Sequence, residues 1–389
     1  MTEKGDSGNK DIEKYAEAIK KNPRDDKAYN NLGNAYYSAQ QYEKALKQYQ
    51  EALRIKQEWI YFSNMGDAYV GLGEVDKAID NYEKALQINK DGDDFVNNSL
   101  GNAYSIKGDY DKAIKNYNRA ISINPSHIYY TNVGDVYRIK GEGDKAIDFY
   151  EQAIEISPEY APAHNGMGIV YYTKGDYNKA IDCYLKAAQF APNDFIYYAN
   201  IGDAYDKLQN WDKAEEYFQK AVELNPQDDM SYNSLGNAYF GQGLYSKAIE
   251  KYKKVLSIKE DPIYYVNIGD AYKRLKKWEQ ALEFYKKAAE KAPGDTRLRT
   301  NLFHLHNDLG VEYYVKAEYD KSVSEYEYAL GCGAPDKNAE ATVQHNLYLA
   351  YQAKANYKKA KEYLLKAIEL DKDNQTYSAE LVDLRKKSG

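Results

Sequence analysis

The sequence is poor in the residues that define several common classes of protein. Its only two cysteines, Cys183 and Cys332, lie far apart, which excludes a disulfide scaffold and a cysteine-rich zinc site. No apolar run approaches the roughly 18 residues of a membrane span, and residues 1–10 have no apolar core. We therefore expect neither membrane insertion nor a signal peptide. With 25 glycines and 9 prolines among 389 residues, a disordered or linker-rich chain is not expected either.

The chain also lacks the positive charge that many nucleic-acid-binding proteins carry. It has 53 lysines and arginines against 60 aspartates and glutamates, a net charge of −7. A binder that relies on overall positive charge is excluded, and we expect no nucleic-acid partner. Because no targeting segment is evident, the expected location is the cytoplasm.

What the chain has in excess is tyrosine, with 43 tyrosines against 9 phenylalanines, and an internal repeat accounts for them. The motif apolar-Gly-x-x-Tyr recurs every 33 to 35 residues through its first eight copies. Its glycines are Gly33, Gly66, Gly101, Gly134, Gly168, Gly202, Gly236, Gly269 and Gly310, and a tenth copy has Tyr348 instead. When positions are counted so that this glycine is position 8, alanine recurs at positions 20 and 27 and an aromatic residue at position 24. The tyrosines are therefore interpreted mainly as packing residues.

Each unit is predicted to consist of two helices joined by a turn. Small residues at positions 8, 20 and 27 let two helix backbones approach closely, and the aromatic residues fill the space beside them. A proline after many units ends the second helix. A 34-residue helix–turn–helix with this pattern resembles the tetratricopeptide repeat, and ten copies cover residues 26–372. The resemblance implies an all-α fold, a right-handed α-α superhelix.

The repeat also predicts how the chain is organised. We expect a disordered N-terminus at residues 1–10, a half-repeat helix at 11–25, eight regular units at 26–293, two irregular units at 294–373 and a capping helix at 374–389. The even-numbered regular units share the pattern Ile-Tyr-x-x-Asn-x-Gly-Asp. Units one to eight are therefore interpreted as a two-unit block used four times.

The first helix of each unit has a second face with an unusual composition. Positions 4, 8 and 11 face the partner helix, whereas positions 2, 6, 9 and 13 lie about 180° away. A face turned away from the local core should be rich in lysine and glutamate, yet this one carries isoleucine and side-chain amides, which is typical of a contact surface. The candidate binding residues on or beside it are Asn31, Asn34, Ile60, Asn64, Asp67, Asn102, Ile128, Asn132, Asp135, Ile196, Asn200, Asp203, Asn237, Ile263, Asn267, Asp270, Lys273 and Arg274.

Two interpretations of the asparagines are open. A column of amides can hydrogen-bond the backbone of an extended peptide whatever its sequence, while neighbouring apolar residues take its side chains. Alternatively, the amides bond neighbouring helices and set the superhelical pitch. In the tetratricopeptide family this face lines the concave groove, and the O-linked N-acetylglucosamine transferases carry an asparagine ladder there. The corresponding position here holds Asn31, Asn64, Asn132, Asn200 and Asn267, but also Ser99, Gly166 and Ser234.

We therefore expect a non-catalytic protein–protein interaction scaffold that binds an extended peptide or a partner's helix in the concave groove. No enzyme activity, metal or cofactor is predicted, because His304 and His306 point apart on a helix and neither cysteine has an evident acid–base partner. The pattern of the chaperone C-terminal-tail clamp is missing, since no triplet of units supplies its lysines and arginines. The alternatives are a self-assembling scaffold, which would form a homo-oligomer, and the recognition arm of a larger enzyme.

The C-terminal part of the repeat is irregular. The 41 residues between Gly269 and Gly310 exceed the usual interval by seven, so we expect a first helix that is two turns longer. Residues 331–340 are predicted to form a longer turn. The segment from residue 271 to 299 carries nine basic and four acidic residues. This segment is interpreted either as a site that prefers acidic ligands or as the solvated face of a decayed terminal repeat.

Overall fold

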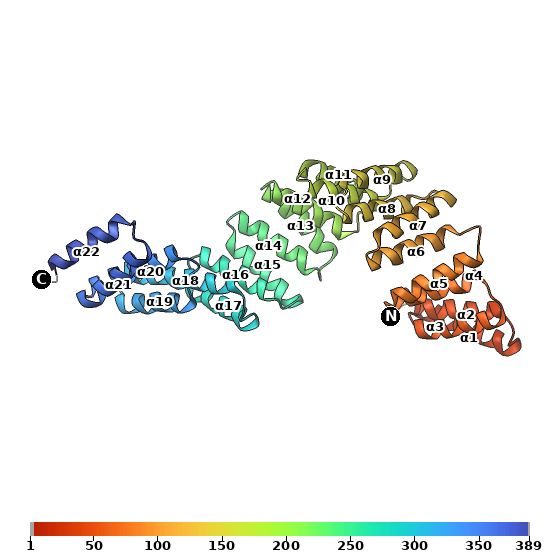
Figure 1. The fold of residues 1–389 in the computed structure, drawn as a ribbon, viewed down its shortest axis with the longest axis horizontal. Coiled ribbons are helices and arrows are strands. Elements are labelled where there is room, and N and C mark those ends of the chain that lie inside the picture. Colours follow the sequence, from red (N-terminus) through yellow and green to blue (C-terminus); the bar gives the residue numbers. More distant parts are fainter. Residues whose placement is uncertain (1–3, 388–389) are drawn as a thin grey trace. The chain divides into compact units, whose positions relative to one another are not determined.

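The computed structural model describes residues 4–387, and within this range the chain forms 22 helices and no strand (Figure 1). The prediction of an all-α array of helix pairs is confirmed. Apart from α1 and α22, the helices alternate as the first and second helices of ten repeats.

The helices have the following bounds: α1 (Lys4–Lys21), α2 (Asp26–Ser38), α3 (Tyr42–Ile55), α4 (Trp59–Gly71), α5 (Val75–Ile88), α6 (Asp94–Lys107), α7 (Tyr110–Ile123), α8 (His127–Ile139), α9 (Gly143–Ile156), α10 (Ala161–Thr173), α11 (Tyr177–Phe190), α12 (Phe195–Lys207), α13 (Trp211–Leu224), α14 (Asp229–Gly241), α15 (Tyr245–Ile258), α16 (Pro262–Arg274), α17 (Trp278–Lys291), α18 (Thr296–Val315), α19 (Tyr319–Cys332), α20 (Lys337–Ala353), α21 (Tyr357–Leu370) and α22 (Gln375–Lys387).

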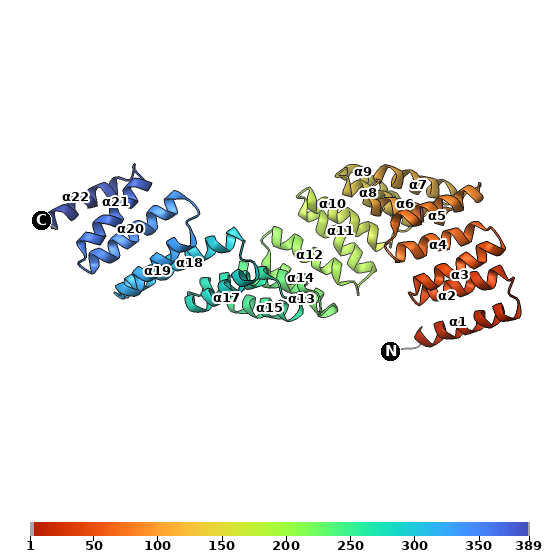
Figure 2. The same ribbon diagram turned by 60° about the horizontal axis from the view of Figure 1, so that its bottom comes forward.

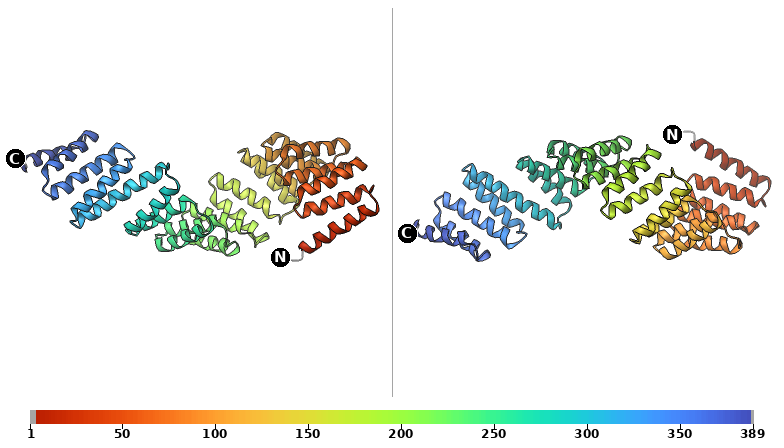
Figure 3. Two further views of the ribbon diagram at one scale, coloured as in Figure 1. Left: turned by 90° about the horizontal axis from the view of Figure 1, so that it is seen from below. Right: turned by 90° about the horizontal axis from the view of Figure 1, so that it is seen from above.

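The chain divides into two compact units, Met1–Ala204 and Tyr205–Gly389, and the division falls inside α12. Within each unit the first helix of a repeat packs against its second helix, and the second helix packs against the first helix of the next repeat. Figure 2 shows this stacking for α1 to α4, and Figure 3 shows it for α18 to α21. Each helix is thus covered by its neighbours in sequence, as the repeat predicts.

The contact between the two helices of a repeat depends on the glycine at position 8 and the tyrosine at position 24. A Cβ added to Gly66 would lie 2.5 Å from Cε1 of Tyr82, so the ring occupies the space that a side chain would need. The same approach occurs at Gly33 against Tyr49 and at Gly310 against Tyr326. These rings are at most 2% exposed, which confirms the interpretation of the position-24 tyrosines as core residues.

The turn inside each repeat needs one residue in the left-handed region. Position 15 has a positive φ in all ten repeats. Five repeats have glycine there, namely Gly73, Gly108, Gly141, Gly175 and Gly243. The other five have Gln40, Gln209, Lys276, Ala317 and Ala355, with φ between 53° and 60°. A residue with a Cβ is strained in this region by roughly 1–2 kcal/mol, so half of the turns carry a local cost.

The two ends of the array differ in detail from the sequence prediction. α1 spans Lys4–Lys21, although the sequence predicts disorder for residues 1–10 and a helix only from residue 11. Residues 4–10 extend the helix that follows them, because adding residues to a helix costs less than starting one. Residues 1–3 and 388–389 of the predicted terminal segments lie outside the described residues. α22 buries Tyr377 and Leu384 against the last repeat.

In the irregular repeats one prediction is confirmed and another is wrong. α18 has 20 residues where the first helices of the regular repeats have 13 or 14, which confirms the two extra turns. The predicted turn at 331–340 is wrong at both ends, because α19 continues to Cys332 and α20 begins at Lys337. The Asp336 carboxylate accepts a hydrogen bond from the Ala339 amide (2.8 Å) and so caps α20 early.

Candidate functional site

The first helices carry a row of exposed apolar side chains at position 2. The four even-numbered regular repeats place isoleucine there, at 41–46% exposure, and two odd-numbered repeats place Phe95 (70%) and Met230 (72%) there. We call these residues the apolar row: Ile60, Phe95, Ile128 and Ile196 in the first compact unit, Met230 and Ile263 in the second. Folding does not require large apolar side chains at exposed positions. A row of them that recurs at one helix position therefore indicates a contact surface.

The asparagines at position 6 of the even-numbered repeats each donate to an asparagine of the preceding repeat. In every case the acceptor is Oδ1 of the asparagine at position 5, one repeat earlier. The pairs are Asn64–Asn30 (2.7 Å), Asn132–Asn98 (2.7 Å), Asn200–Asn165 (2.8 Å), Asn267–Asn233 (2.9 Å) and, in the irregular repeats, Asn346–Asn307 (3.0 Å). Their amide N–H groups thus do what the second interpretation predicts, bonding neighbouring helices.

A second set of bonds strengthens the same interfaces. In three of the four regular blocks the tyrosine at position 3 of the even-numbered repeat donates to the aspartate at position 1 of the preceding odd-numbered repeat; the fifth repeat has Ala161 at that position. The bonds are Tyr61–Asp26 (2.6 Å), Tyr129–Asp94 (2.8 Å) and Tyr264–Asp229 (2.9 Å). The interfaces from an even-numbered to an odd-numbered repeat use other groups, with Tyr104 donating to Glu83 and Tyr239 to Glu215. The two-unit period therefore corresponds to two kinds of interface.

The carbonyl oxygens of the position-6 asparagines are left for other partners. Within residues 4–387 the structure gives no hydrogen-bond partner to Oδ1 of Asn64, Asn132, Asn200 or Asn267. All four side chains are partly exposed. The position-5 bond therefore fixes each amide in one orientation and leaves an acceptor available, so the structural interpretation does not exclude the ligand interpretation.

Position 9 is held by the tyrosine at position 24 of the same repeat. In the odd-numbered repeats the hydroxyl donates to Asn34, Asn102 or Asn237, at 2.8 Å in each case. In the even-numbered repeats it donates to Asp67 (2.6 Å), Asp135 (2.8 Å) or Asp270. The sixth repeat has Phe218 at position 24, which has no hydroxyl to donate. Six of the predicted binding residues are therefore also parts of the helix-pair packing.

Burial changes the acid–base behaviour of two of these aspartates. It raises the pKa of Asp67 and of Asp270, while the tyrosine hydrogen bond acts in the opposite direction. Asp135 has an additional partner, because Nη2 of Arg138 lies 3.0 Å from its Oδ1 and Nε of Arg138 also contacts the Tyr150 hydroxyl. Arg138, at position 12, thus makes these contacts within its own repeat.

The predicted basic end of the face is only partly neutralised. Nζ of Lys273 lies 2.8 Å from Oδ2 of Asp308 in α18. Arg274 is exposed and its guanidinium lies over the ring of Phe240, 5.8 Å from the centroid. Together with Asp270, Lys276 and Trp278, these two cations and Phe240 line a pocket of about 610 Å³.

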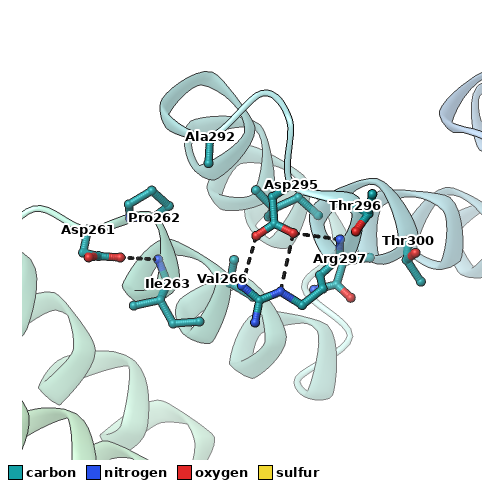
Figure 4. Close-up of a pocket in the computed structure, with 11 residues that line it drawn as sticks. Asp261, Pro262, Ile263, Val266, Ala292, Asp295, Thr296, Arg297 and Thr300 are labelled. Carbon is teal, nitrogen blue, oxygen red and sulfur yellow. Dashed lines mark hydrogen bonds and ion pairs between the residues drawn. The ribbon is translucent and has the colours of Figure 1, made fainter.

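A second pocket, of about 540 Å³, lies at the other end of α16. It is bordered by the start of α16, the turn after α17 and the first two turns of α18 (Figure 4). Pro262, Ile263, Val266 and Leu298 supply its apolar wall. Neither this pocket nor the role of the position-5 asparagines was predicted from the sequence. The pocket is formed in part by the first turns of the longer α18. The position-5 asparagines recur in the odd-numbered repeats, and this recurrence is visible in the sequence.

The other chemical groups do not form a reactive site. Burial raises the pKa of the Cys183 thiol to about 11 and also raises that of Cys332, so neither is activated. Nδ1 of His306 pairs with Glu325 (2.7 Å) in α19, away from a shared site with His304. The part of the chain that the structure describes contains no group of three or more side chains able to hold a metal. Nor does it contain a helix that could span a bilayer.

Comparisons with known proteins identify the repeat. Family models described as tetratricopeptide repeat or TPR repeat match residues 26–58, 59–91, 96–127, 134–175, 159–227, 194–261, 262–295 and 341–374, which is well over half of the chain. No curated protein matches.

Among solved structures, the chain is similar to YrrB, a tetratricopeptide-repeat protein described as having an unusual peptide-binding site. The identity is 27%, the match covers 47% of this chain and 95% of YrrB, and the TM-score is 0.42. It is also similar to MamA (31% identity, 42% and 91% covered, TM-score 0.41). A thermophilic repeat protein from Thermus thermophilus matches at 21% identity (45% and 96% covered, TM-score 0.37). On the family matches, the chain belongs to the tetratricopeptide-repeat proteins, and thus to the protein–protein interaction scaffolds built from this generally non-catalytic module.

Proposed function

We propose that the first helices bind an extended peptide of a partner protein along the face that carries positions 2, 6, 9 and 13. We call this surface the first-helix face, and by analogy with the family it lines the concave groove. The apolar row takes side chains of the peptide, and Oδ1 of the position-6 asparagines accepts from its backbone N–H groups. The exposed apolar row is the observation that carries the proposal.

The chemistry of the side-chain amides favours an extended chain as the ligand. Backbone N–H groups of an extended peptide are offered at regular intervals whatever its sequence, and amide oxygens held in one orientation can accept from them. Because each position-6 amide is fixed by its position-5 partner, little side-chain entropy is lost on binding. The fixed amides therefore act both in the repeat interface and as pre-oriented acceptors.

The test compares three variants of the whole chain in affinity capture from the native lysate. The first replaces Ile60, Ile128, Ile196 and Ile263 by serine, and the second replaces Asn64, Asn132, Asn200 and Asn267 by alanine. The third is the matched control, with Asn30, Asn98, Asn165 and Asn233 replaced by alanine. It removes the same interhelical bonds as the second variant but keeps the position-6 amides.

We expect partners of the wild type to be lost by the isoleucine variant and weakened in the position-6 variant. The control keeps the amide oxygens but no longer holds them in one orientation, so it should lose less binding than the position-6 variant, although the two should melt about equally early. Equal capture by the wild type and the isoleucine variant would refute the proposal. Equal losses in the control and the position-6 variant would assign the asparagines to repeat packing alone.

A further inference from the structure

Helix α16 borders both pockets described above, one at each of its ends. The 540 Å³ pocket uses Ile263 and Val266 from its first turns, and the 610 Å³ pocket uses Asp270, Lys273 and Arg274 from its last turns. These residues occupy positions 2, 5, 9, 12 and 13. At 100° per residue they fall within about 100° of one another, so both pockets open on the same side of one helix.

The pocket at the start of α16 suits an apolar group. Its apolar wall includes Ile263, the last member of the apolar row, and Leu298, which is buried in α18. Its two acidic residues are occupied by local bonds, since Asp261 caps α16 at the Ile263 amide and Asp295 pairs with the Arg297 side chain (Figure 4). The two carboxylates at the edge of this pocket are therefore bonded to groups at the starts of α16 and α18.

The pocket at the end of α16 suits an acidic group. In the fourth repeat the cation at position 12, Arg138, is bound by Asp135 and Tyr150 of its own repeat. In the eighth repeat the Tyr285 hydroxyl donates a hydrogen bond to Asp270, and Lys273 forms an ion pair with Asp308. The guanidinium of the exposed Arg274 lies over the Phe240 ring and forms no ion pair with the described residues, although burial raises the pKa of Asp270 and the charge of Arg274 opposes this rise. It is therefore arranged to meet an acid from outside the chain.

We propose that α16 binds a peptide segment in which a large apolar side chain and an acidic cluster are separated by about five residues. The apolar side chain enters the pocket beside Ile263, and the acidic cluster lies against Arg274 and Lys276. Ile263 and Arg274 are eleven residues apart on a helix that rises about 1.5 Å per residue, so the two ends lie about 16 Å apart. An extended chain spans this distance in about five residues.

This inference rests on the proposed function, because it specifies the ligand of one part of the first-helix face. It goes beyond it in naming the charge and spacing of the recognised segment. It also chooses between the two interpretations of the basic segment at residues 271–299, in favour of a site for acidic ligands.

The experiment measures binding of a fluorescein-labelled peptide to the whole chain by anisotropy. The probe has one leucine, four alternating serines and glycines, and three glutamates, and it is made in both sequence directions. We expect at least one direction to bind about tenfold more tightly than versions with serine for leucine, glutamine for the glutamates, or no spacer. The first two changes each remove one end of the contact, and the third prevents both ends from binding at once.

Two matched pairs of variants locate the binding. Arg274→Gln with Lys276→Gln should weaken binding about tenfold, whereas Lys286→Gln with Lys287→Gln, which removes two exposed cations from the second helix α17, should not. Ile263→Ser should weaken binding, whereas Ile88→Ser should not, since Ile88 is similarly exposed but lies in the second helix α5, off the first-helix face. All six residues are exposed, so the variants should fold like the wild type.

Several outcomes would overturn the inference. These are insensitivity to the spacer, equal losses in both members of either pair, or no binding in either direction. Displacement by tripolyphosphate or by a single-stranded oligonucleotide as effective as by unlabelled peptide would assign the basic pocket to phosphate instead. The short probe reaches only α16, so it reports on this site independently of the isoleucine variant. The proposed function can therefore fail while this site is confirmed, and the reverse.

Discussion

The regular repeats and the tenth repeat solve the same packing problem with different residues. In the second repeat Gly66 leaves room for the ring of Tyr82, which is 1% exposed. In the tenth repeat the glycine is replaced by Tyr348 and the tyrosine by Leu364, and both are buried as well, at 3% and 0%. The bulk has moved from the second helix to the first. The two positions thus form a pair in which one side chain carries the aromatic ring and the other adapts to it.

The hydrogen bond between asparagine side chains of neighbouring repeats does not depend on the glycine–tyrosine pair. Asn346 in the tenth repeat donates to Asn307 in the ninth, as in the four regular blocks, although the glycine–tyrosine pair is gone. The contact within a repeat and the bond between repeats are therefore separable features. A substitution in one should leave the other intact, and this gives each a test of its own.

The largest effect is expected when the within-repeat pair is mismatched. Gly66→Ala places a Cβ at 2.5 Å from the Tyr82 ring and should lower the free energy of unfolding by about 2–3 kcal/mol. Adding Tyr82→Leu, which copies Leu364, should recover much of this loss. Urea unfolding of the wild type, both single variants and the double variant gives the coupling energy.

The same double substitution at Gly236 and Tyr252 serves as a replicate in the other compact unit, where the added Cβ would also lie 2.4 Å from the ring. Additive losses in the two single variants would show that Tyr348 and Leu364 do not replace the glycine–tyrosine pair as a unit.

A smaller effect is expected where an even-numbered repeat is given the chemistry of an odd-numbered one. Asp67→Asn keeps an acceptor for the Tyr82 hydroxyl, since Asn34 and Asn102 accept from their own tyrosines in this way. Burial raises the pKa of Asp67, so its ionised form is unfavourable in the folded state. The variant should therefore be more stable than the wild type at pH 7.

The stability gained by Asp67→Asn should depend on pH, in a direction set by the raised pKa of Asp67. Between the ordinary pKa of an aspartate and the raised pKa of Asp67, the folded chain binds more protons than the unfolded chain, so stability falls as pH rises. The gain from Asp67→Asn should therefore disappear below the ordinary aspartate pKa of about 4. Thermal melts at pH 3.5 and pH 7 measure it, with Asn102→Asp as the reverse substitution. A gain of equal size at both pH values would show that ionisation is not its cause.

The parts of the fold that follow from local residue patterns were predictable. Helix pairs, their packing through Gly66 and its equivalents, and the two extra turns of α18 all follow from spacing along the chain, because a helix repeats every 3.6 residues. The early start of α20 was not predicted, since it depends on the Asp336 side chain capping the helix at Ala339.

The candidate site was predicted less completely than the fold, because its residues have partners in other repeats. The sequence places Asn64 on the first-helix face, but its acceptor Asn30 becomes evident only when the two helices are aligned in space. The pocket beside Ile263 depends on where α18 begins relative to α16, and a sequence period gives lengths without that geometry. Residue types indicated a surface, and only the packing shows which groups on it are still available.

The smallest effect is expected at the turns inside the repeats, where some repeats have glycine at position 15 and others have a residue with a Cβ. Gln209 and Gly243 occupy position 15 of the sixth and seventh repeats, with φ of 56° and 77°. Gln209→Gly should raise the melting temperature slightly, because the relief of strain is partly offset by the greater flexibility of glycine in the unfolded chain. Gly243→Ala should lower it by a similar amount, since nothing lies within 4 Å of its added Cβ and only the backbone conformation is strained. Differential scanning calorimetry of both variants measures this strain without a change in packing. Shifts of the same sign would show that position 15 is not governed by the left-handed conformation.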